Sequence, residues 1–372
     1  MKKNWIPIIV VIIIIIVIAV FYKPAPKGTI KIGAILPLTG QVSFLGEGMQ
    51  NAIELAVDEI NSIGGVNGRM LEIIYEDSKT EGDEAVTAAN KLINIDKVPI
   101  MIVGITYEVL PVAPIAEQSN VLLLSPCSSN PAVTNAGDYI FRNMASDVDQ
   151  GKYAAQFVYN ELGLKKVAIL YTQTDWGLSL KEAFNKTLDQ LGGDIVIEEG
   201  FSKEAIDLRT QLVKIKDTDA EIIFFLGDPA NTKAGFRQMV ELGINLPVIG
   251  GALWDNPGLW QELGNLVEGA MYVKVTTPES AKLNEFQSKF LQKTGSDKVI
   301  VCSPQAYDLV KILANALKKA GVNSMAVKDE LYKVRDYEGV SGDITFDENG
   351  DLLNPEMATF IIKDGHVVPY EE

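Results

Sequence analysis

The stretch IGAILPLTGQVSFLGEGMQNAIELAVDEINSIGGVNGRMLEIIYEDS, residues 32–78, decides the fold class. It begins within an apolar, β-rich run over 29–36, which is typical of a buried strand. Apolar residues then recur at helical spacing over 46–65, and Gly64–Gly65 is a typical helix stop. A second strand-like run follows at 70–77. Strand, helix and strand in this order predict a parallel sheet with helices on its faces.

The same alternation continues along the chain and then repeats. We expect further strands at 99–104, 121–125, 166–171, 194–201, 221–227, 247–251 and 270–275, and further helices at 83–95, 109–120, 177–193, 206–218 and 233–244. The order found over 31–104 returns over 166–227, including a long helix that ends on two glycines. Such internal repetition indicates two similar open α/β lobes.

A third stretch completes the chain. Helical patterns cover 283–295, 303–321 and 326–334, and two hairpins are expected with turns at Asn349–Gly350 and Asp364–Gly365. Helices that come this late must cover a lobe formed earlier. The chain is therefore expected to return to its first lobe.

The N-terminus carries an almost unbroken apolar run, Trp5–Tyr22. Eighteen helical residues span roughly 27 Å, close to the hydrocarbon thickness of a membrane. Lys2 and Lys3 precede the run and favour a cytoplasmic N-terminus. We therefore expect residues 1–27 to be a membrane anchor and linker, and the protein to be a single-pass cell-membrane protein with an extracytoplasmic C-terminal domain. The alternative is a cleaved signal peptide with an atypical cleavage site.

The charge of the chain restricts its partners. The 372 residues carry 33 basic and 49 acidic side chains, a net charge of −16. The four lysines of residues 1–27 leave 29 basic and 49 acidic residues, or −20, for the rest. Because phosphate binding requires a basic face, a nucleic-acid partner is not expected.

Motifs for catalysis, cofactors and metals are missing from the sequence. The single histidine, His366, lies near the C-terminus and excludes a histidine triad or cluster. The Gly46-Glu-Gly48 segment resembles part of a dinucleotide fingerprint, but its third position is Asn51 and a long loop separates it from the strand. We expect no cofactor and no metal.

The two cysteines, Cys127 and Cys302, cannot build a disulfide framework and form no CxxC motif. Each follows or lies close to an apolar run. We interpret both as small buried residues rather than reactive thiols.

Candidate ligand-binding residues follow the predicted strands. The segment from Ser125 to Pro131 is dense in hydroxyl and backbone donors that can hold a carboxylate, although an ordinary turn-rich loop has the same composition. Trp176, in the equivalent of the first long loop, either covers a ligand or packs on its own lobe. Most acidic residues of so acidic a chain are solvated, but four carboxylates fall near predicted strand ends: Asp147, Asp149, Asp228 and Asp255.

Five segments together give the chain a specific resemblance over about residues 29–370. They are the opening stretch 32–78, VAPIAEQSNVLLLSPCSSNPAVT (112–134), IFRNMASDVDQG (140–151), VAILYTQTDWGLSL (167–180) and GFRQMVELGI (235–244). The chain resembles the branched-chain amino-acid (Leu/Ile/Val) binding proteins of ABC transporters, which have the type I periplasmic-binding fold.

This resemblance implies two Rossmann-like α/β lobes with a ligand cleft and three crossovers, here preceded by one transmembrane helix. The crossovers are expected near Ala145–Asp147, Thr276–Pro278 and Gly339–Gly342. In the implied domain organisation, lobe 1 comprises 28–146 plus 277–340, and lobe 2 comprises 147–276 plus 341–372.

The resemblance also implies roles for individual residues. Thr106 and the loop Ser125–Ser129, including the backbone of Cys127, Ser128 and the hydroxyl of Ser129, match positions that hold the ligand carboxylate. Asp147 matches the acceptor for the ammonium group, and Trp176 matches the aromatic residue that covers the ligand.

Two departures from the family pattern affect the site. The loop after the third strand is short and carries Tyr107 and Glu108. The acidic residue that many relatives place after the VIGG strand is replaced by Ala252, so Asp228 or Asp255 would have to substitute.

The implied function is that of an extracytoplasmic solute-binding protein of an ABC transporter. It would capture a small amino-acid-like ligand, such as a branched-chain amino acid, and deliver it to ABC permease subunits. The alternative is a receptor domain of the same fold that signals rather than transports. An enzyme is disfavoured because catalytic motifs are missing.

Overall fold

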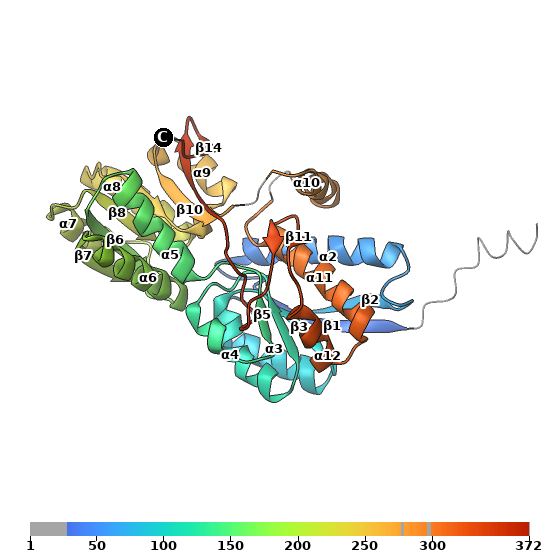
Figure 1. The fold of residues 1–372 in the computed structure, drawn as a ribbon. Coiled ribbons are helices and arrows are strands. Elements are labelled where there is room, and N and C mark those ends of the chain that lie inside the picture. The colour runs from blue at the N-terminus through green and yellow to red at the C-terminus, as the bar shows by residue number, and fades with distance from the viewer. Residues whose placement is uncertain (1–27, 277–278, 296–298, 372) are drawn as a thin grey trace, which may run out of the picture.

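The computed structural model of this chain describes residues 28–276, 279–295 and 299–371. Two α/β lobes lie beside one another (Figure 1), and the expected second crossover, Thr276–Pro278, falls mostly outside the described residues. The expected membrane anchor, Trp5–Tyr22, falls outside the described residues. Within the described ranges, no helix is both long and apolar enough to cross a membrane.

Lobe 1 is built on a five-stranded parallel sheet with the order β2-β1-β3-β4-β5. β1 and β2 pair in register from Thr29 opposite Met70 to Leu36 opposite Asp77. The strands are β1 (Thr29–Leu36), β2 (Met70–Asp77), β3 (Ile100–Val103), β4 (Leu122–Ser125) and β5 (Ile140–Arg142).

Helices cover both faces of this sheet because the strand side chains alternate between two cores. Along β1, Ile32 and Ala34 join the core under one set of helices, whereas Ile35 joins the opposite core. The first set is α2 (Ser43–Ser62), α10 (Ala281–Thr294), α11 (Ser303–Ala320) and α12 (Ser324–Leu331). The second set is α3 (Gly82–Asn94) and α4 (Thr106–Gln118). The helices that come late in the sequence thus pack on the lobe that comes first in the sequence.

Lobe 2 contains a seven-stranded sheet with the order β14-β13-β10-β9-β8-β6-β7. Five strands are parallel, and the C-terminal hairpin adds two antiparallel strands beside β10. The strands are β6 (Lys166–Thr172), β7 (Asp194–Phe201), β8 (Ile222–Leu226), β9 (Val248–Gly250), β10 (Met271–Val275), β13 (Met357–Lys363) and β14 (His366–Pro369).

The helices of lobe 2 again lie on two faces. One core contains residues of α5 (Asp147–Gln156) and α6 (Asp175–Leu191). The other contains residues of α8 (Pro229–Leu242) and of two short helices, α7 (Arg209–Lys216) and α9 (Pro257–Leu263). In this second core the fully buried Trp254 packs so tightly on Gly250 that a Cβ atom there would lie 2.4 Å from the indole. Trp254 is therefore a packing residue of its own lobe.

The two lobes share one strand order. In lobe 2 the order β7-β6-β8-β9-β10 repeats the order β2-β1-β3-β4-β5 of lobe 1. In each lobe the order reverses next to the first strand, between β1 and β3 and between β6 and β8. Open α/β sheets bind ligands outside the carboxyl ends of their strands at such a switch point.

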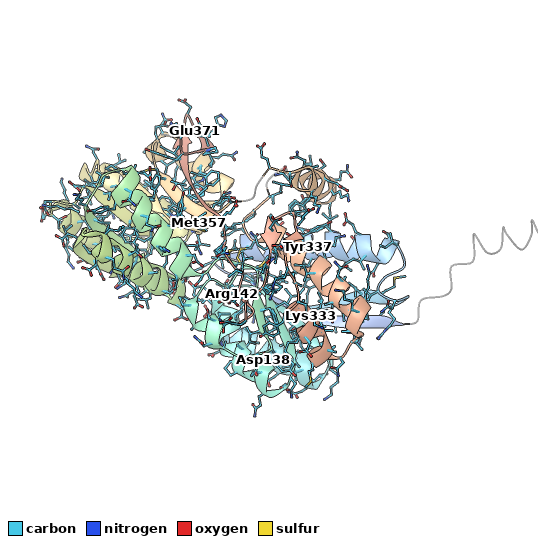
Figure 2. All side chains as sticks on the ribbon, viewed as in Figure 1. Asp138, Arg142, Lys333, Tyr337, Met357 and Glu371 are labelled. Atoms are coloured by element: carbon cyan, nitrogen blue, oxygen red, sulfur yellow. A yellow bond between two sulfur atoms is a disulfide. The ribbon has the colours of Figure 1, made fainter. Side chains whose placement is uncertain are left out.

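The third crossover lies further along the chain than Gly339–Gly342, where it was expected. The short strands β11 (Tyr337–Glu338) and β12 (Asp343–Ile344) pair with each other, and Ile344 and Phe346 are buried in the core of lobe 1. The chain joins the sheet of lobe 2 only at Met357, which Figure 2 labels above Arg142 of lobe 1. Residues 343–352 therefore belong to lobe 1 rather than lobe 2.

Candidate ligand-binding site

A cavity of about 60 Å³ lies between the carboxyl ends of the strands of both lobes. Lobe 1 contributes residues that follow β1, β3 and β4, and lobe 2 contributes residues that follow β6, β8 and β9. The lining residues are Val42, Leu45, Ile105, Thr106, Tyr107, Cys127, Ser129, Met144, Gln150, Trp176, Asp228, Ala252, Leu253, Val301 and Cys302. The cavity thus occupies the place that the strand order predicts.

Several of the lining residues lie at helix N-termini. Thr106 is the first residue of α4, Trp176 is the second residue of α6, and Asp228 is the N-cap of α8. The first N–H groups of a helix have no intrahelical acceptor and form a positive end that attracts anions. A ligand carboxylate beside Thr106 would meet such an end.

The serine loop after β4 is held by its own hydroxyl groups. The Ser125 hydroxyl donates to the carbonyl of Gly104 at 3.0 Å, and the Ser128 N–H donates to the Ser125 hydroxyl at 3.1 Å. The hydroxyl oxygens of Ser128 and Thr106 are 3.2 Å apart. Ser129 and Thr106 line the cavity, whereas Ser128 supports Thr106 from behind.

Asp228 supplies a carboxylate to the cavity. Its side chain is almost completely buried, and within the described part of the chain its Oδ1 atom has no hydrogen-bond partner. Burial raises the pKa of Asp228 to about 6, although the charge of Lys203 opposes this shift. A buried carboxylate with a free oxygen is suited to accept a cationic group.

Asp147, the expected ammonium acceptor, is not among the residues that line the cavity. It is fully buried at the start of α5, where its carboxylate accepts the Ser179 hydroxyl and its N–H donates to the carbonyl of Ser129 at 2.7 Å. Burial raises the pKa of Asp147 to about 6, opposed by the hydroxyl groups of Ser179 and Ser129. The structure thus places this carboxylate behind Ser129.

Asp255 is bound elsewhere. Its carboxylate accepts the Tyr272 hydroxyl at 2.8 Å and the Lys274 ammonium at 2.7 Å. It lines a neighbouring hollow rather than the cavity. Of the two proposed substitutes for the acid missing at Ala252, Asp228 alone lines the cavity.

The remaining wall of the cavity is apolar, and the sequence did not indicate most of it. Val42, Leu45, Met144, Leu253 and Val301 all line the cavity. Nothing in the sequence separates such residues from ordinary core residues, since both are apolar. For Val42, Leu45, Met144 and Leu253, a position after a strand end is the signal that could have indicated them, whereas Val301 lies between α10 and α11.

The structure agrees with both interpretations of Trp176. It lines the cavity, and it also packs on its own lobe, where a Cβ atom at Gly251 would lie 3.1 Å from its ring. Only 9% of its surface is exposed. Trp176 is therefore mostly buried and borders the cavity.

Cys302 is buried as expected, whereas Cys127 is only partly buried, and the pairing of the two cysteines was not expected. Cys127 and Cys302 form a disulfide across 175 residues of sequence, and both line the cavity. In the ranges that the structure describes, no group of three or more His, Cys, Asp or Glu side chains could hold a metal ion.

The departures in the loop after β3 have a structural role. Glu108 is completely buried, accepts the Ile105 N–H at 2.9 Å and contacts the Ser78 hydroxyl. Burial raises the pKa of Glu108 to about 8, and these hydrogen bonds oppose the shift. Tyr107 reaches the cavity, and its pKa is raised by burial and by the nearby Asp228.

The two lobes touch each other close to the cavity. Lys203 of lobe 2 forms an ion pair with Glu81 of lobe 1 at 2.7 Å. The side-chain amide of Asn130 donates to the carbonyl of Asp175 at 3.1 Å, again between lobes. The structure therefore has its lobes in contact beside the cavity.

Two lobes that meet over a cavity with a polar end and an apolar wall define a solute-binding protein. The chain belongs to the family described as periplasmic binding protein, whose sequence profile matches residues 29–366. This is a family of solute-binding proteins rather than enzymes.

Individual relatives agree with this assignment. The chain is 27% identical to Leu/Ile/Val-binding protein homolog 3 of Brucella melitensis over 94% of this chain and 96% of that protein. Among solved structures it is similar to the leucine-binding protein LivK of Thermotoga maritima, with a TM-score of 0.86, 28% identity and coverage of 92% and 98% of the two chains. It is also similar to the branched-chain amino acid transporter substrate-binding protein LivJ of Streptococcus pneumoniae in complex with isoleucine, with a TM-score of 0.84, 28% identity and coverage of 92% and 100%.

Proposed function

We propose that this protein captures an amino acid with an aliphatic side chain, of the leucine, isoleucine and valine type, for import by an ABC transporter. The observation that carries the proposal is the cavity, in which two hydroxyl groups and the carboxylate of Asp228, whose Oδ1 atom has no hydrogen-bond partner among the described residues, meet an apolar wall. An aliphatic amino acid has three parts that complement these: an ammonium group, a carboxylate and an apolar side chain. The names of the similar proteins support this ligand class.

Each part of the ligand has a counterpart in the cavity. The ligand carboxylate would accept hydrogen bonds from Thr106, at the N-terminus of α4, and from Ser129, in the loop after β4. Its ammonium group would pair with Asp228, and its side chain would pack on Trp176 and Leu45. A charged ligand end without a counterpart would be costly to bury.

Asp147 is the second acceptor in this proposal. Its buried Oδ1 atom lacks a hydrogen-bond partner among the described residues, and its backbone N–H binds the carbonyl of the cavity residue Ser129. A ligand bound to Ser129 would therefore lie near the carboxylate of Asp147. Comparison of Asp147 with Asp228 by mutation separates the two roles.

Ligand binding would select the state in which the lobes are together. A ligand that contacts both lobes binds this state more tightly than an open one, and the permease subunits would recognise the closed form. Identical small-angle scattering curves with and without saturating leucine would contradict this part of the proposal.

The ligand would be captured outside the cytoplasm, with the binding domain tethered to the cell membrane through Trp5–Tyr22. The support is the length and apolar character of this run and the two lysines before it. N-terminal sequencing of the protein from its native membrane tests the tether. A mature N-terminus beyond Tyr22 would show cleavage instead.

Titration calorimetry of the full-length chain in detergent tests the function directly. Leucine, isoleucine and valine should bind, and saturation at about 100 times Kd should stabilise the fold by about 2.7 kcal/mol. Glutamate and lysine serve as charged controls that the apolar wall should reject. If none of the aliphatic amino acids binds, the proposed ligand class is wrong.

A further inference from the structure

The disulfide between Cys127 and Cys302 is part of the cavity wall. Cys127 lies in the loop after β4 that also carries Ser129, and Cys302 immediately precedes α11. Val301, the neighbour of Cys302, lines the cavity as well. The bond therefore connects the polar corner of the cavity to its apolar wall.

On the α11 side, the disulfide is attached to an unusual backbone turn. Cys302 has a φ angle of +75°, in the left-handed region that residues with a Cβ atom rarely adopt. The turn is closed by the Ala306 N–H, which donates to the carbonyl of Cys302 at 2.9 Å, and by the Ser303 N–H, which donates to the carbonyl of Ile300 at 3.1 Å. A covalent bond at this residue opposes relaxation of the turn and of the adjacent Val301.

On the other side, the disulfide is attached to a loop held by hydrogen bonds, among them those from Arg142 to the carbonyl of Asn130 at 2.8 Å and from the Asp147 N–H to the carbonyl of Ser129 at 2.7 Å. The Ser128 N–H binds the Ser125 hydroxyl, and Asn130 reaches the carbonyl of Asp175 in lobe 2. Each such hydrogen bond makes only a modest net contribution to stability. The disulfide is a constraint that water cannot replace.

We propose that the Cys127–Cys302 disulfide is a positioning element of the ligand site, so that the oxidised protein binds its ligand more tightly than the reduced protein. A site that is already ordered loses less conformational freedom when the ligand binds. The choice of probe ligand rests on the proposed function given above. The placement of the bond in the cavity wall does not.

Reduction by a small dithiol gives a defined product. A thiolate of the reductant attacks one sulfur of the pair to form a mixed disulfide, and the second reductant thiol then displaces the remaining cysteine. Cys127 and Cys302 together gain two electrons and two protons and end as thiols, while the dithiol is oxidised to its own disulfide. Because the chain contains only two cysteines, the reductant has no other target in the protein.

Calorimetry on the full-length chain, before and after treatment with dithiothreitol, tests the proposal with leucine and isoleucine as probes. We expect affinity to fall roughly tenfold on reduction while the helical circular dichroism stays unchanged. The variant Cys127→Ala/Cys302→Ala should match the reduced protein and should not respond to the reductant. Hydrogen exchange without ligand should become faster within 125–130 and 299–306.

Each outcome decides the proposal. Equal affinities of the oxidised and reduced forms would overturn it, because the bond would then contribute to stability alone. Loss of the helical signal on reduction would also overturn it, since the bond would be holding the whole fold. If the oxidised protein binds none of these amino acids, the proposed function fails, and exchange decides the inference. Unchanged exchange in both segments would then overturn it.

Discussion

Arg142 and Asp351 form a two-point ion pair between residues 209 positions apart, with distances of 2.7 and 2.8 Å. Arg142 ends β5 and is only 1% exposed. Thr134 donates its hydroxyl to the same carboxylate at 2.6 Å. The pair fixes the segment before the third crossover on lobe 1, where Figure 2 labels Arg142 near the junction of the lobes. This is why the chain leaves lobe 1 after residue 352.

Replacing Asp351 with asparagine should destabilise lobe 1 by about 3 kcal/mol, because it leaves the charge of Arg142 buried without its partner. Guanidinium unfolding of the two proteins measures the change. Glu241→Gln is a matched control, because it breaks the exposed ion pair of Glu241 with Arg209 and should leave stability unchanged. Equal effects of the two substitutions would show that burial of Arg142 is unimportant.

The alternation of strands and helices could be predicted from the sequence because it follows apolar periodicity. The first residues of the helices at the site were predicted less accurately. α4 was expected from residue 109 but begins at Thr106, and α8 was expected from residue 233 but begins at Pro229. The first turn of α4 contains the cavity residues Thr106 and Tyr107, and the cavity residue Asp228 caps α8, so these helix starts lack the apolar periodicity on which the prediction depended. Thr106 and Asp228 were named as candidate ligand-binding residues, but the starts of the helices beside them were expected too far along the chain.

Contacts between residues far apart in the chain could not be predicted from the sequence, for a different reason. Cys127 and Cys302 are 175 residues apart, and no local pattern indicates that they meet. The same holds for Arg142 and Asp351, which set the position of the third crossover. Local periodicity predicts elements, whereas these pairs arise only when the late helices return to lobe 1.

The substitution Asp228→Asn should weaken binding of leucine roughly 30-fold or more, since it removes the charge that faces the ligand ammonium. Asp147→Asn should have a much smaller effect, because Asp147 lies behind Ser129 and outside the cavity lining. Both substitutions conserve size, so each is the control for the other in calorimetry. A larger loss of leucine affinity in Asp147→Asn than in Asp228→Asn would show that Asp147 is the main ammonium acceptor.

The affinity for leucine should fall at acidic pH. Burial raises the pKa of Asp228 to about 6, with Lys203 as the opposing charge and Tyr107 close by. The ammonium group requires the ionised carboxylate, so protonation below pH 6 competes with binding. We expect affinity at pH 5 to be roughly tenfold lower than at pH 7. Calorimetry across this range measures it, and Asp228→Asn should be nearly independent of pH. A constant affinity in the unmodified protein would exclude Asp228 as the acceptor.

Glu108 should make the fold less stable as the pH rises. Its pKa in the folded protein is raised from 4.5 to about 8, so between these values the folded state holds a proton that the unfolded state releases. Stability is then greatest at low pH and is lost as the pH rises toward 8. Asp147 and Asp228 share this direction only up to about pH 6. From pH 6 to pH 8 the loss through Glu108 should be about 2 kcal/mol.

Guanidinium unfolding at pH 6 and pH 8 measures this loss, and Glu108→Gln supplies the control. Glutamine keeps the uncharged form, so the variant should show little change between the two pH values and should be the more stable protein at pH 8. It should also retain leucine binding, because the amide can still accept the N–H of Ile105. An equal loss of stability in both proteins would assign the effect to another group.

Trp176 should report ligand binding through its fluorescence. It is the tryptophan that lines the cavity, whereas Trp254 and Trp260 are buried in the core of lobe 2. Leucine should therefore change the emission of the unmodified protein, and Trp176→Phe should remove most of that change while conserving an aromatic surface. Trp176→Ala should weaken binding by about 2 kcal/mol, or roughly 30-fold, because the aliphatic side chain loses its cover. Calorimetry measures this affinity independently of fluorescence. If Trp176 serves only its packing on Gly251, the alanine variant will unfold more easily and yet bind leucine with unchanged affinity.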